Sequence, residues 1–412
     1  MSFCLKKSFF FIVFTFLSLS SLVAEARVYT GLEVFLAKYT YIVKGKRVGL
    51  ITNPTGVDAK LNATVDLLKQ SPNVNLVALF APEHGIRGNV RAGMNVADGK
   101  DPGTGLPVYT LYGRNGHRPS AEMLSNVDVL IYDIQDVGSR AYTYIWHLAE
   151  CMSAAAEFGK TVIVLDRPDP FGGSIVDGPV SEKKYLSFIG LYPIPRVYGM
   201  TVGELARYLN IEEKINCHLQ VVPMINYKRG MTWKETGLPW VPTSPHIPTP
   251  DAACCFAATG TIGEIGGVNI GIGYTLPFQC IASPWIHAEK MARDLNSYNL
   301  PGVRFRPIYY RPYYAAYKES NIQGIQIFVT DASKFRPATT EVAIVTYLKK
   351  HYSSLGQFAF RKDKIATVDK AMGTSSVRRQ IEAGWGYPAI IATWRRKLNE
   401  FKGKRRKYLI YK

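Results

Sequence analysis

The first half of the chain alternates short apolar runs with segments of helical periodicity. Runs rich in Val, Leu and Ile predict β-strands at 48–53, 75–80, 127–134, 161–165 and 219–224. Segments with helical spacing or a capping signature predict helices at 63–69, 144–158 and 201–209. The run at 161–165 is apolar almost throughout, which is typical of a strand that is covered on both faces. The alternation therefore predicts an α/β fold built on a parallel sheet.

The pattern changes in the second half. Five prolines lie between residues 238 and 250, a density that excludes a helix or a central strand there. The rest of the chain is rich in Gly and Tyr. We therefore expect a first domain over residues 27–226 and a smaller α+β domain over residues 227–412.

The N-terminus has the three parts of a cleavable secretion signal. Lys6 and Lys7 precede an apolar stretch over residues 9–22, and Ala24 and Ala26 supply a small-residue cleavage site. The alternative is a retained membrane anchor, but Ser and Thr interrupt the stretch and it is short for a bilayer span. The sequence predicts removal of residues 1–26 and export to the periplasm or the exterior, and no later stretch is long and apolar enough to span.

The net charge of +18 is concentrated near the C-terminus. Residues 395–412 contain nine Lys or Arg and one Glu, which favours either attraction to an anionic envelope surface or a solvated terminal helix. Nucleic acid is a poor partner for an exported chain without a base-reading motif. The five cysteines outside the signal have no metal-site spacing, and dinucleotide, P-loop and serine-elbow motifs are absent, so we expect no cofactor or metal.

Polar residues follow four of the predicted strands. They occupy segments 53–56, 82–88, 133–140 and 166–169. Because the carboxyl ends of parallel strands meet at one edge of a sheet, these segments should form a single rim. Carboxylates beside cations at such a rim indicate general acid–base chemistry on a polar substrate.

Three of the segments also carry a family resemblance. They are 82–88 (Pro-Glu-His-Gly-Ile-Arg-Gly), 135–144 (Gln-Asp-Val-Gly-Ser-Arg-Ala-Tyr-Thr-Tyr) and 165–173 (Leu-Asp-Arg-Pro-Asp-Pro-Phe-Gly-Gly). They resemble the exo-acting β-N-acetylmuramidase family of glycoside hydrolases, and the similarity extends over nearly the whole mature chain. The resemblance implies a Rossmann-like first domain, a smaller second domain and a cleft between them. It also implies release of terminal N-acetylmuramic acid from the non-reducing end of peptidoglycan fragments.

The sequence departs from the family pattern at two places. Val197 and Tyr198 stand where the family commonly has Arg and His, and Ile270, Ile272 and Leu276 replace a glutamate and two arginines. Losing an arginine removes a charge and five hydrogen-bond donors. Two alternatives to the muramidase therefore stay open, namely a non-catalytic peptidoglycan-binding protein and a hydrolase of another envelope glycan.

Five residues are candidates for the chemistry. Glu83 is the first choice for the general acid because it follows a buried strand at the start of a Gly-rich loop. His84 could assist it or be a structural histidine. The candidates for a second carboxylate are Asp133, Asp136 and Glu264, although one of the aspartates could instead cap the turn at 138–139.

Six residues are candidates for substrate binding. Arg140 and Arg167 could hold the lactyl carboxylate of a muramyl group or pair with the neighbouring acids. Tyr142 and Tyr144 could form a wall on which a sugar stacks, though their alternation shows only that one side of the segment is aromatic. The remaining two, each in a polar segment of the rim, are Asn53 and Arg87.

Overall fold

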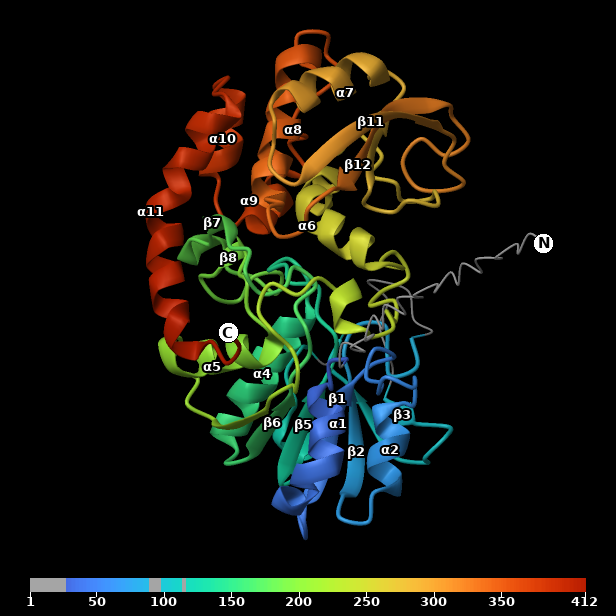
Figure 1. The fold of residues 1–412 in the computed structure, drawn as a ribbon, viewed down its shortest axis with the longest axis vertical. Helices are drawn as coiled ribbons and strands as arrows, with labels where there is room; N and C mark the ends of the chain where they lie inside the picture. Colours follow the sequence, from blue (N-terminus) through green and yellow to red (C-terminus); the bar gives the residue numbers. More distant parts are fainter. Residues whose placement is uncertain (1–26, 89–97, 113–115) are drawn as a thin grey trace, which may run out of the picture.

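The apolar runs of the first half form one seven-stranded sheet in the computed structural model, which describes residues 27–88, 98–112 and 116–412 (Figure 1). The expected secretion signal lies outside these residues. The strand order is β3-β4-β2-β1-β5-β6-β9, and every neighbouring pair is parallel except β3–β4. The strands are β1 (Arg47–Thr52), β2 (Asn75–Ala81), β3 (Gly99–Lys100), β4 (Pro107–Thr110), β5 (Val129–Asp133), β6 (Thr161–Leu165) and β9 (His218–Val222).

Helices cover both faces of this sheet, as the apolar strands require. Val48 and Leu50 of β1 face one apolar cluster, whereas Ile51 faces another, because successive side chains of a strand point to opposite faces. On the first face lie α1 (Gly31–Val34), η1 (Phe35–Tyr39), η2 (Thr40–Val43) and α2 (Thr64–Gln70). On the second face lie α3 (Ala121–Leu124), α4 (Tyr144–Glu157) and α5 (Val202–Glu212). The predicted α/β class is confirmed.

The second domain is built on a smaller antiparallel sheet of order β10-β12-β11. Its strands are β10 (Cys280–Ser283), β11 (Val303–Tyr310) and β12 (Ile322–Val329). Its helices are α6 (Pro250–Ile265), α7 (Ala288–Ser297), α8 (Pro337–Tyr352), α9 (Ile365–Met372) and α10 (Ser376–Glu382). Short elements join the two parts, namely β7 (Asp177–Val180), η3 (Lys183–Tyr185), β8 (Pro195–Val197) and η4 (Lys234–Thr236).

The proline-rich segment differs from the prediction at its last residue. Pro250, expected outside any helix, opens α6 at a position where a proline is tolerated because the first N–H of a helix needs no intrahelical partner. Thr249 caps this helix by accepting a hydrogen bond from the Ala252 N–H (3.1 Å). The rest of the segment, residues 238–249, contains no helix or strand, as expected.

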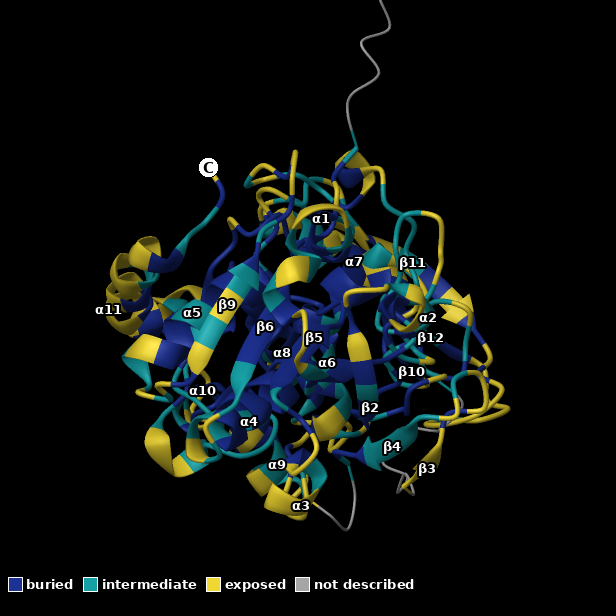
Figure 2. Cartoon of the chain, turned by 90° about the horizontal axis from the view of Figure 1, so that it is seen from below, coloured by how far each residue is buried: buried dark blue, intermediate teal, exposed yellow. Residues whose placement is uncertain are grey.

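The basic C-terminus is built into the fold. The long helix α11 (Tyr387–Arg405) and the turn η5 (Arg406–Tyr408) run from the second domain back to the first (Figure 1). At the chain end the Tyr411 hydroxyl donates to the buried Asp166 carboxylate (2.6 Å), and the Ile410 N–H donates to Glu204 (2.7 Å). Figure 2 shows that the outer side of α11 is exposed while the inner strands β5 and β6 of the large sheet are buried. Within the described parts of the chain, no helix is long and apolar enough to cross a membrane.

Candidate active site

The polar segments meet at one edge of the large sheet, as the sequence predicts. We call the residues that directly follow β1, β2, β4, β5 and β6 the carboxyl rim. Thr52 pairs with Asp133 across β1 and β5, and Ala81 pairs with Thr110 across β2 and β4, so these strands end at the same level. From β1 the chain continues to β2 on one side of β1, whereas β5 lies on the other side of β1. The strand order therefore reverses between β1 and β5, which makes this edge a topological switch point.

Glu83 is a half-buried carboxylate of the carboxyl rim. The Thr143 hydroxyl donates to its Oε2 (3.1 Å) from the N-terminus of α4. Thr143 occupies the N-cap position of this helix but makes no capping hydrogen bond with its side chain. The N-terminus of α4 therefore lies beside Glu83.

Tyr112 completes the surroundings of Glu83 from the end of β4. Burial, together with the charge of Glu83 and a hydrogen bond to it, raises the pKa of Tyr112 to about 12. The tyrosine is therefore protonated at neutral pH and serves as a donor beside the carboxylate. Neither Tyr112 nor Thr143 was among the predicted site residues. Thr143 lies in the segment that carries the resemblance, but no local signal in the sequence pointed to Tyr112.

His84 lies beside Glu83 in an unusual backbone conformation. Its φ of 75° is in the left-handed region, which few residues other than glycine adopt, and its side chain is buried. Burial, and then the proximity of His84, lowers the pKa of His246, which belongs to the proline-rich segment. His246 in turn contacts Tyr314 of the second domain (Nε2 to hydroxyl oxygen, 3.1 Å). His84 therefore marks the place where the second domain approaches the carboxyl rim.

Asn53, Tyr142 and Tyr144 support the rim from within. Asn53 Oδ1 accepts from the backbone N–H (2.9 Å) and the hydroxyl (2.6 Å) of Thr55. The Tyr144 hydroxyl donates to the Thr243 carbonyl (2.5 Å), and its ring packs edge-on against Tyr142 (4.9 Å between centroids). Both tyrosines are at most 9% exposed, so their placement favours a supporting role over the predicted sugar-stacking wall.

Asp133 and Arg167 form a buried ion pair instead of an open site. Arg167 Nε and Nη2 lie 2.5 and 2.8 Å from the two carboxylate oxygens of Asp133. The Thr64 hydroxyl also donates to Asp133 (2.5 Å), and Arg167 Nη2 reaches the Val57 carbonyl (2.8 Å). Asp133 is fully buried and Arg167 is 5% exposed, so the structure favours ion pairing over the predicted catalytic and substrate-binding roles.

Asp136 lies beneath the rim in a second buried cluster. The Gly138 N–H (2.7 Å) and the Tyr198 hydroxyl donate to its Oδ2. Gly138 has a φ of 73°, and a Cβ there would lie 2.5 Å from an oxygen of Asp169, so the turn requires glycine. Asp136 thus has the turn-capping role that we considered for one of the aspartates. Tyr198, one of the two departures from the family pattern, is a direct partner of this carboxylate.

Burial raises the pKa of three aspartates in and near this cluster. The pKa is about 6 for Asp136 and about 7 for both Asp166 and Asp169, in each case chiefly because burial disfavours the charged form. Neighbouring charges add to this effect, Glu204 for Asp166 and Asp136 for Asp169. The folded protein therefore holds protons that the unfolded chain releases above about pH 4.

These raised pKa values predict that stability falls as the pH rises. The folded state is stabilised by holding these protons. This stabilisation is complete below the ordinary carboxyl pKa, and it is lost as the pH rises through the pKa values of the folded state, about 6 to 7. We expect a higher melting temperature at pH 5 than at pH 8 in thermal unfolding followed by circular dichroism. Asp136→Asn, which cannot ionise, should make this dependence shallower. A melting temperature that rises from pH 5 to pH 8 would contradict the assignment.

Arg140 forms hydrogen bonds to segments of both domains. It is fully buried, and its guanidinium donates to the carbonyls of Pro179 (2.8 Å), Ile194 (3.0 Å) and Ala371 (2.9 Å). Burial first, and then the charge of Arg196, lowers the pKa of Arg140 to about 9. The predicted binding of a substrate carboxylate would require an exposed guanidinium, so this placement favours a structural role.

The two remaining predicted residues, Arg87 and Glu264, are exposed. Arg87 is exposed and forms a bidentate ion pair with Asp101 (2.9 and 3.0 Å) and a longer contact with Asp66 (3.5 Å). Glu264 is exposed near the end of α6 in the second domain. Of the carboxylates proposed for catalysis, Glu83 is thus the one that combines a place on the rim with partial exposure.

The second departure from the family pattern lies in a loop of the second domain. Asn269 organises this loop, because its Oδ1 accepts from the Gly271 N–H (2.7 Å) and its Nδ2 donates to the Ile272 carbonyl (2.9 Å). The Tyr313 N–H donates to the Gly273 carbonyl (2.8 Å), which joins the loop to the segment that carries Tyr314. The apolar replacements Ile270, Ile272 and Leu276 therefore belong to a loop that is hydrogen-bonded to the segment of Tyr314, the residue that contacts His246.

A parallel α/β domain with a half-buried carboxylate at its switch point, together with a smaller second domain, is typical of two-domain α/β enzymes. No group of three or more His, Cys, Asp or Glu able to hold a metal occurs in the described ranges.

Comparison with known proteins identifies the family. The chain matches the models of the exo-beta-N-acetylmuramidase NamZ N-terminal domain over residues 48–251 and C-terminal domain over residues 254–411. It is 42% identical over 387 residues to the peptidoglycan beta-N-acetylmuramidase NamZ of Bacillus subtilis, covering 94% of this chain and 92% of that protein. The chain therefore belongs to the exo-β-N-acetylmuramidase NamZ family, as the sequence motifs predict.

Two solved structures share the fold. Both are crystal structures of DUF1343 family proteins from Bacteroides fragilis. The first is 42% identical with a TM-score of 0.88, and the second is 32% identical with a TM-score of 0.75. Each comparison covers 94% of this chain and 99% of the solved one, so the similarity includes both domains.

Proposed function

We propose that this protein is an exported exo-β-N-acetylmuramidase that releases terminal N-acetylmuramic acid from the non-reducing end of peptidoglycan fragments, with Glu83 as the general acid. The family membership supports the reaction and the substrate class. The placement of Glu83 is the observation that carries the assignment of the acid. It is half-buried at the rim, whereas Asp133 and Asp136 are buried.

The surroundings of Glu83 suit a proton donor. In its protonated form Glu83 gives its proton to the glycosidic oxygen as that oxygen's bond to the anomeric carbon of the muramyl sugar breaks. The leaving chain departs with a hydroxyl, and water supplies the oxygen that bonds to the anomeric carbon and loses a proton. The carboxylate that remains is stabilised by the Thr143 hydroxyl and by the N-terminus of α4. Tyr112, which stays protonated, supplies a further donor. His84, next to Glu83 in the sequence, would position the substrate or the acid.

Export and association with the envelope belong to the same proposal. The N-terminal signal pattern supports cleavage near Arg27, so sequencing of the exported protein should begin close to that residue. The net charge of +18 supports a salt-sensitive attraction to the anionic envelope. An exported form that begins at Met1 would contradict the cleavage.

A pair of chromogenic substrates tests the activity. The purified mature protein should cleave a chromogenic N-acetylmuramide and leave the matching N-acetylglucosaminide largely intact, because the two sugars differ only by the lactyl group. Binding of muramyl fragments without cleavage of either substrate would instead support the non-catalytic alternative. Equal cleavage of both would favour a hydrolase of another glycan.

A further inference from the structure

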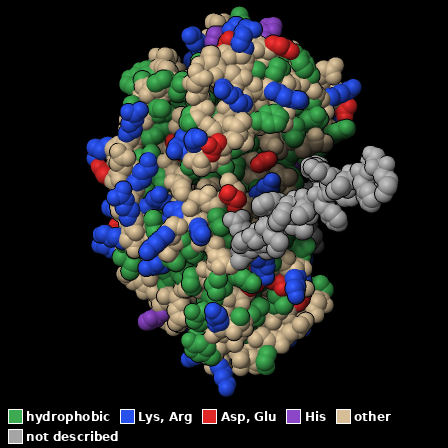
Figure 3. Space-filling view, in the orientation of Figure 1, with side chains coloured by type: hydrophobic (Ala, Val, Ile, Leu, Met, Phe, Trp, Pro, Cys, Tyr) green, Lys and Arg blue, Asp and Glu red, His purple; other side chains and the backbone are tan. Residues whose placement is uncertain are grey.

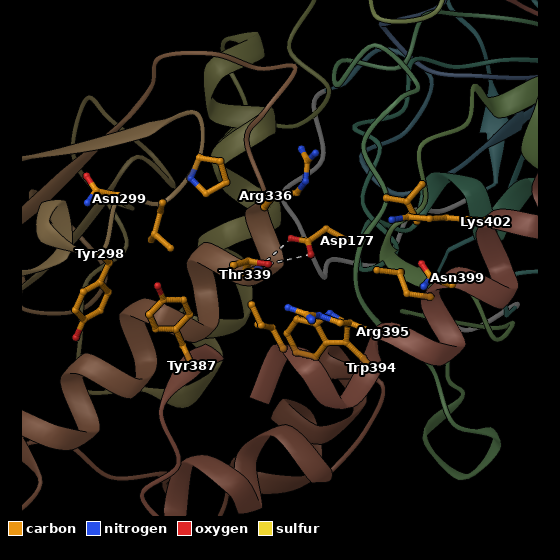
Figure 4. Close-up of a pocket in the computed structure, with 15 residues that line it drawn as sticks. Asp177, Tyr298, Asn299, Arg336, Thr339, Tyr387, Trp394, Arg395, Asn399 and Lys402 are labelled. Atoms are coloured by element: carbon orange, nitrogen blue, oxygen red, sulfur yellow. Dashed lines mark hydrogen bonds between the residues drawn. The ribbon is translucent and has the colours of Figure 1, made fainter. Parts of the chain in front are cut away.

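A groove far from Glu83 in the sequence lies between α11, residues 298–301 and the start of α8 (Figure 4). Its volume of about 500 Å³ is within the range of about 300–1,000 Å³ that is typical of ligand sites. A second groove of about 650 Å³ continues along the same side, because Tyr298 and Tyr387 line both. No residue that lines either groove belongs to the carboxyl rim.

Three cations line the first groove. The side chains of Arg395 and Lys402 in α11 form no hydrogen bond or ion pair with another residue in the described parts of the chain. Arg336 uses one terminal nitrogen for the carbonyls of Lys334 (2.9 Å) and Phe335 (3.1 Å). Figure 4 shows these three side chains around the groove.

The groove contains one carboxylate, and its hydrogen bonds are already made within the protein. Asp177 accepts from the N–H (2.9 Å) and the hydroxyl (3.1 Å) of Thr339 and from the Gly178 N–H (2.9 Å). Burial and the nearby charges of Arg336 and Arg405 lower the pKa of Lys402, since the cations repel one another. An anion in the groove would relieve this repulsion.

Aromatic side chains give the paired grooves an apolar surface as well. Tyr298 and Tyr387 stack on each other with 5.2 Å between ring centroids, and both are half-buried. Trp394 lines the first groove, and Trp385, 47% exposed, lines the second together with Lys349 and Lys350. Aromatic faces beside cations suit a ligand that has apolar ring faces and negative charge.

We propose that these paired grooves form a second, non-catalytic site for a carboxylate-bearing saccharide chain. The inference rests on the envelope association proposed above and gives it a location. Figure 3 shows Lys and Arg side chains gathered along the side of the molecule where α11 lies. Because the first groove is lined by α11, by the second domain and by β7, a bound chain would contact elements of both domains while Glu83 acts on a chain end elsewhere.

Co-sedimentation with purified peptidoglycan sacculi tests this site in the full mature protein. Arg395→Gln with Lys402→Gln should weaken binding at least fivefold, and Trp385→Ala should also weaken it. The control is Arg406→Gln with Lys407→Gln, which removes the same charge from exposed residues outside both grooves and should have a much smaller effect. The kcat and KM for a chromogenic N-acetylmuramide should remain unchanged in all three variants, and the melting temperature reports on their folding.

The outcomes separate this site from the catalytic one. Unchanged binding by the groove variants, or an equal loss in the control, would overturn the proposal while cleavage of the chromogenic substrate leaves the proposed function intact. Soluble N-acetylmuramic acid should release the protein from sacculi more effectively than inorganic phosphate or N-acetylglucosamine at equal concentration. Equal release by phosphate would indicate a general anion site and would also overturn the saccharide assignment.

Discussion

Replacing Glu83 by glutamine is expected to reduce turnover of a natural muramyl disaccharide by about 10²- to 10⁴-fold, the range typical of general acid catalysis. Glutamine keeps the shape of the side chain and can still accept from Thr143, but it has no acidic proton to give. Substrate binding should change little, so the loss should fall on kcat. The measurement is a comparison of kcat and KM for the wild-type and variant proteins.

The leaving group makes this prediction sharper. A nitrophenolate needs less protonation than a sugar hydroxyl, so its release should suffer less from Glu83→Gln than cleavage of the disaccharide. The matched control is Glu264→Gln, which alters an exposed glutamate of the second domain and should leave both rates near wild type. If Glu83 only holds its loop, the variant should lose about 1 kcal/mol of stability and treat both substrates alike.

Replacing Arg167 by methionine is expected to lower the free energy of unfolding by about 3–5 kcal/mol, the cost of leaving a buried charge without its partner. Asp133 is fully buried, so water cannot take the place of the guanidinium. Chemical denaturation measures the loss, and activity per folded molecule should remain close to wild type. If Arg167 instead holds the substrate, stability should change little and KM should rise.

Two further variants separate the effect of burial from that of charge. Adding Asp133→Asn to Arg167→Met removes the unpaired charge and should recover part of the lost stability. Arg396→Met breaks the exposed pair with Glu400, whose side chains are 78% and 55% exposed, and should cost at most about 0.5 kcal/mol. A cost of several kcal/mol in this surface control would show that the methionine, and not burial of the charge, causes the effect.

The sequence alone determined five of the seven strands of the large sheet and the edge at which the polar segments meet, but not β3 and β4. Strands covered on both faces must be apolar throughout, and the polar segments that follow them interrupt this pattern, so both can be recognised locally. The positions of β1, β2, β5, β6 and β9, and the place of Glu83 directly after β2, follow from this pattern. The family motifs lie in the same segments, which is why they indicated the family correctly.

Only the tertiary structure decided which polar residues of the rim are buried in internal hydrogen bonds and ion pairs. Their partners are distant in the sequence: Arg167 is 34 residues from Asp133, the Ala371 carbonyl is 231 residues from Arg140, and Tyr411 is 245 residues from Asp166. A local pattern shows that a carboxylate or a guanidinium is present, but its burial and its hydrogen bonds depend on the residues that the fold brings next to it. The return of α11 to the first domain depends in the same way on contacts between distant segments, because hydrogen bonding and burial are fixed by the folded chain as a whole.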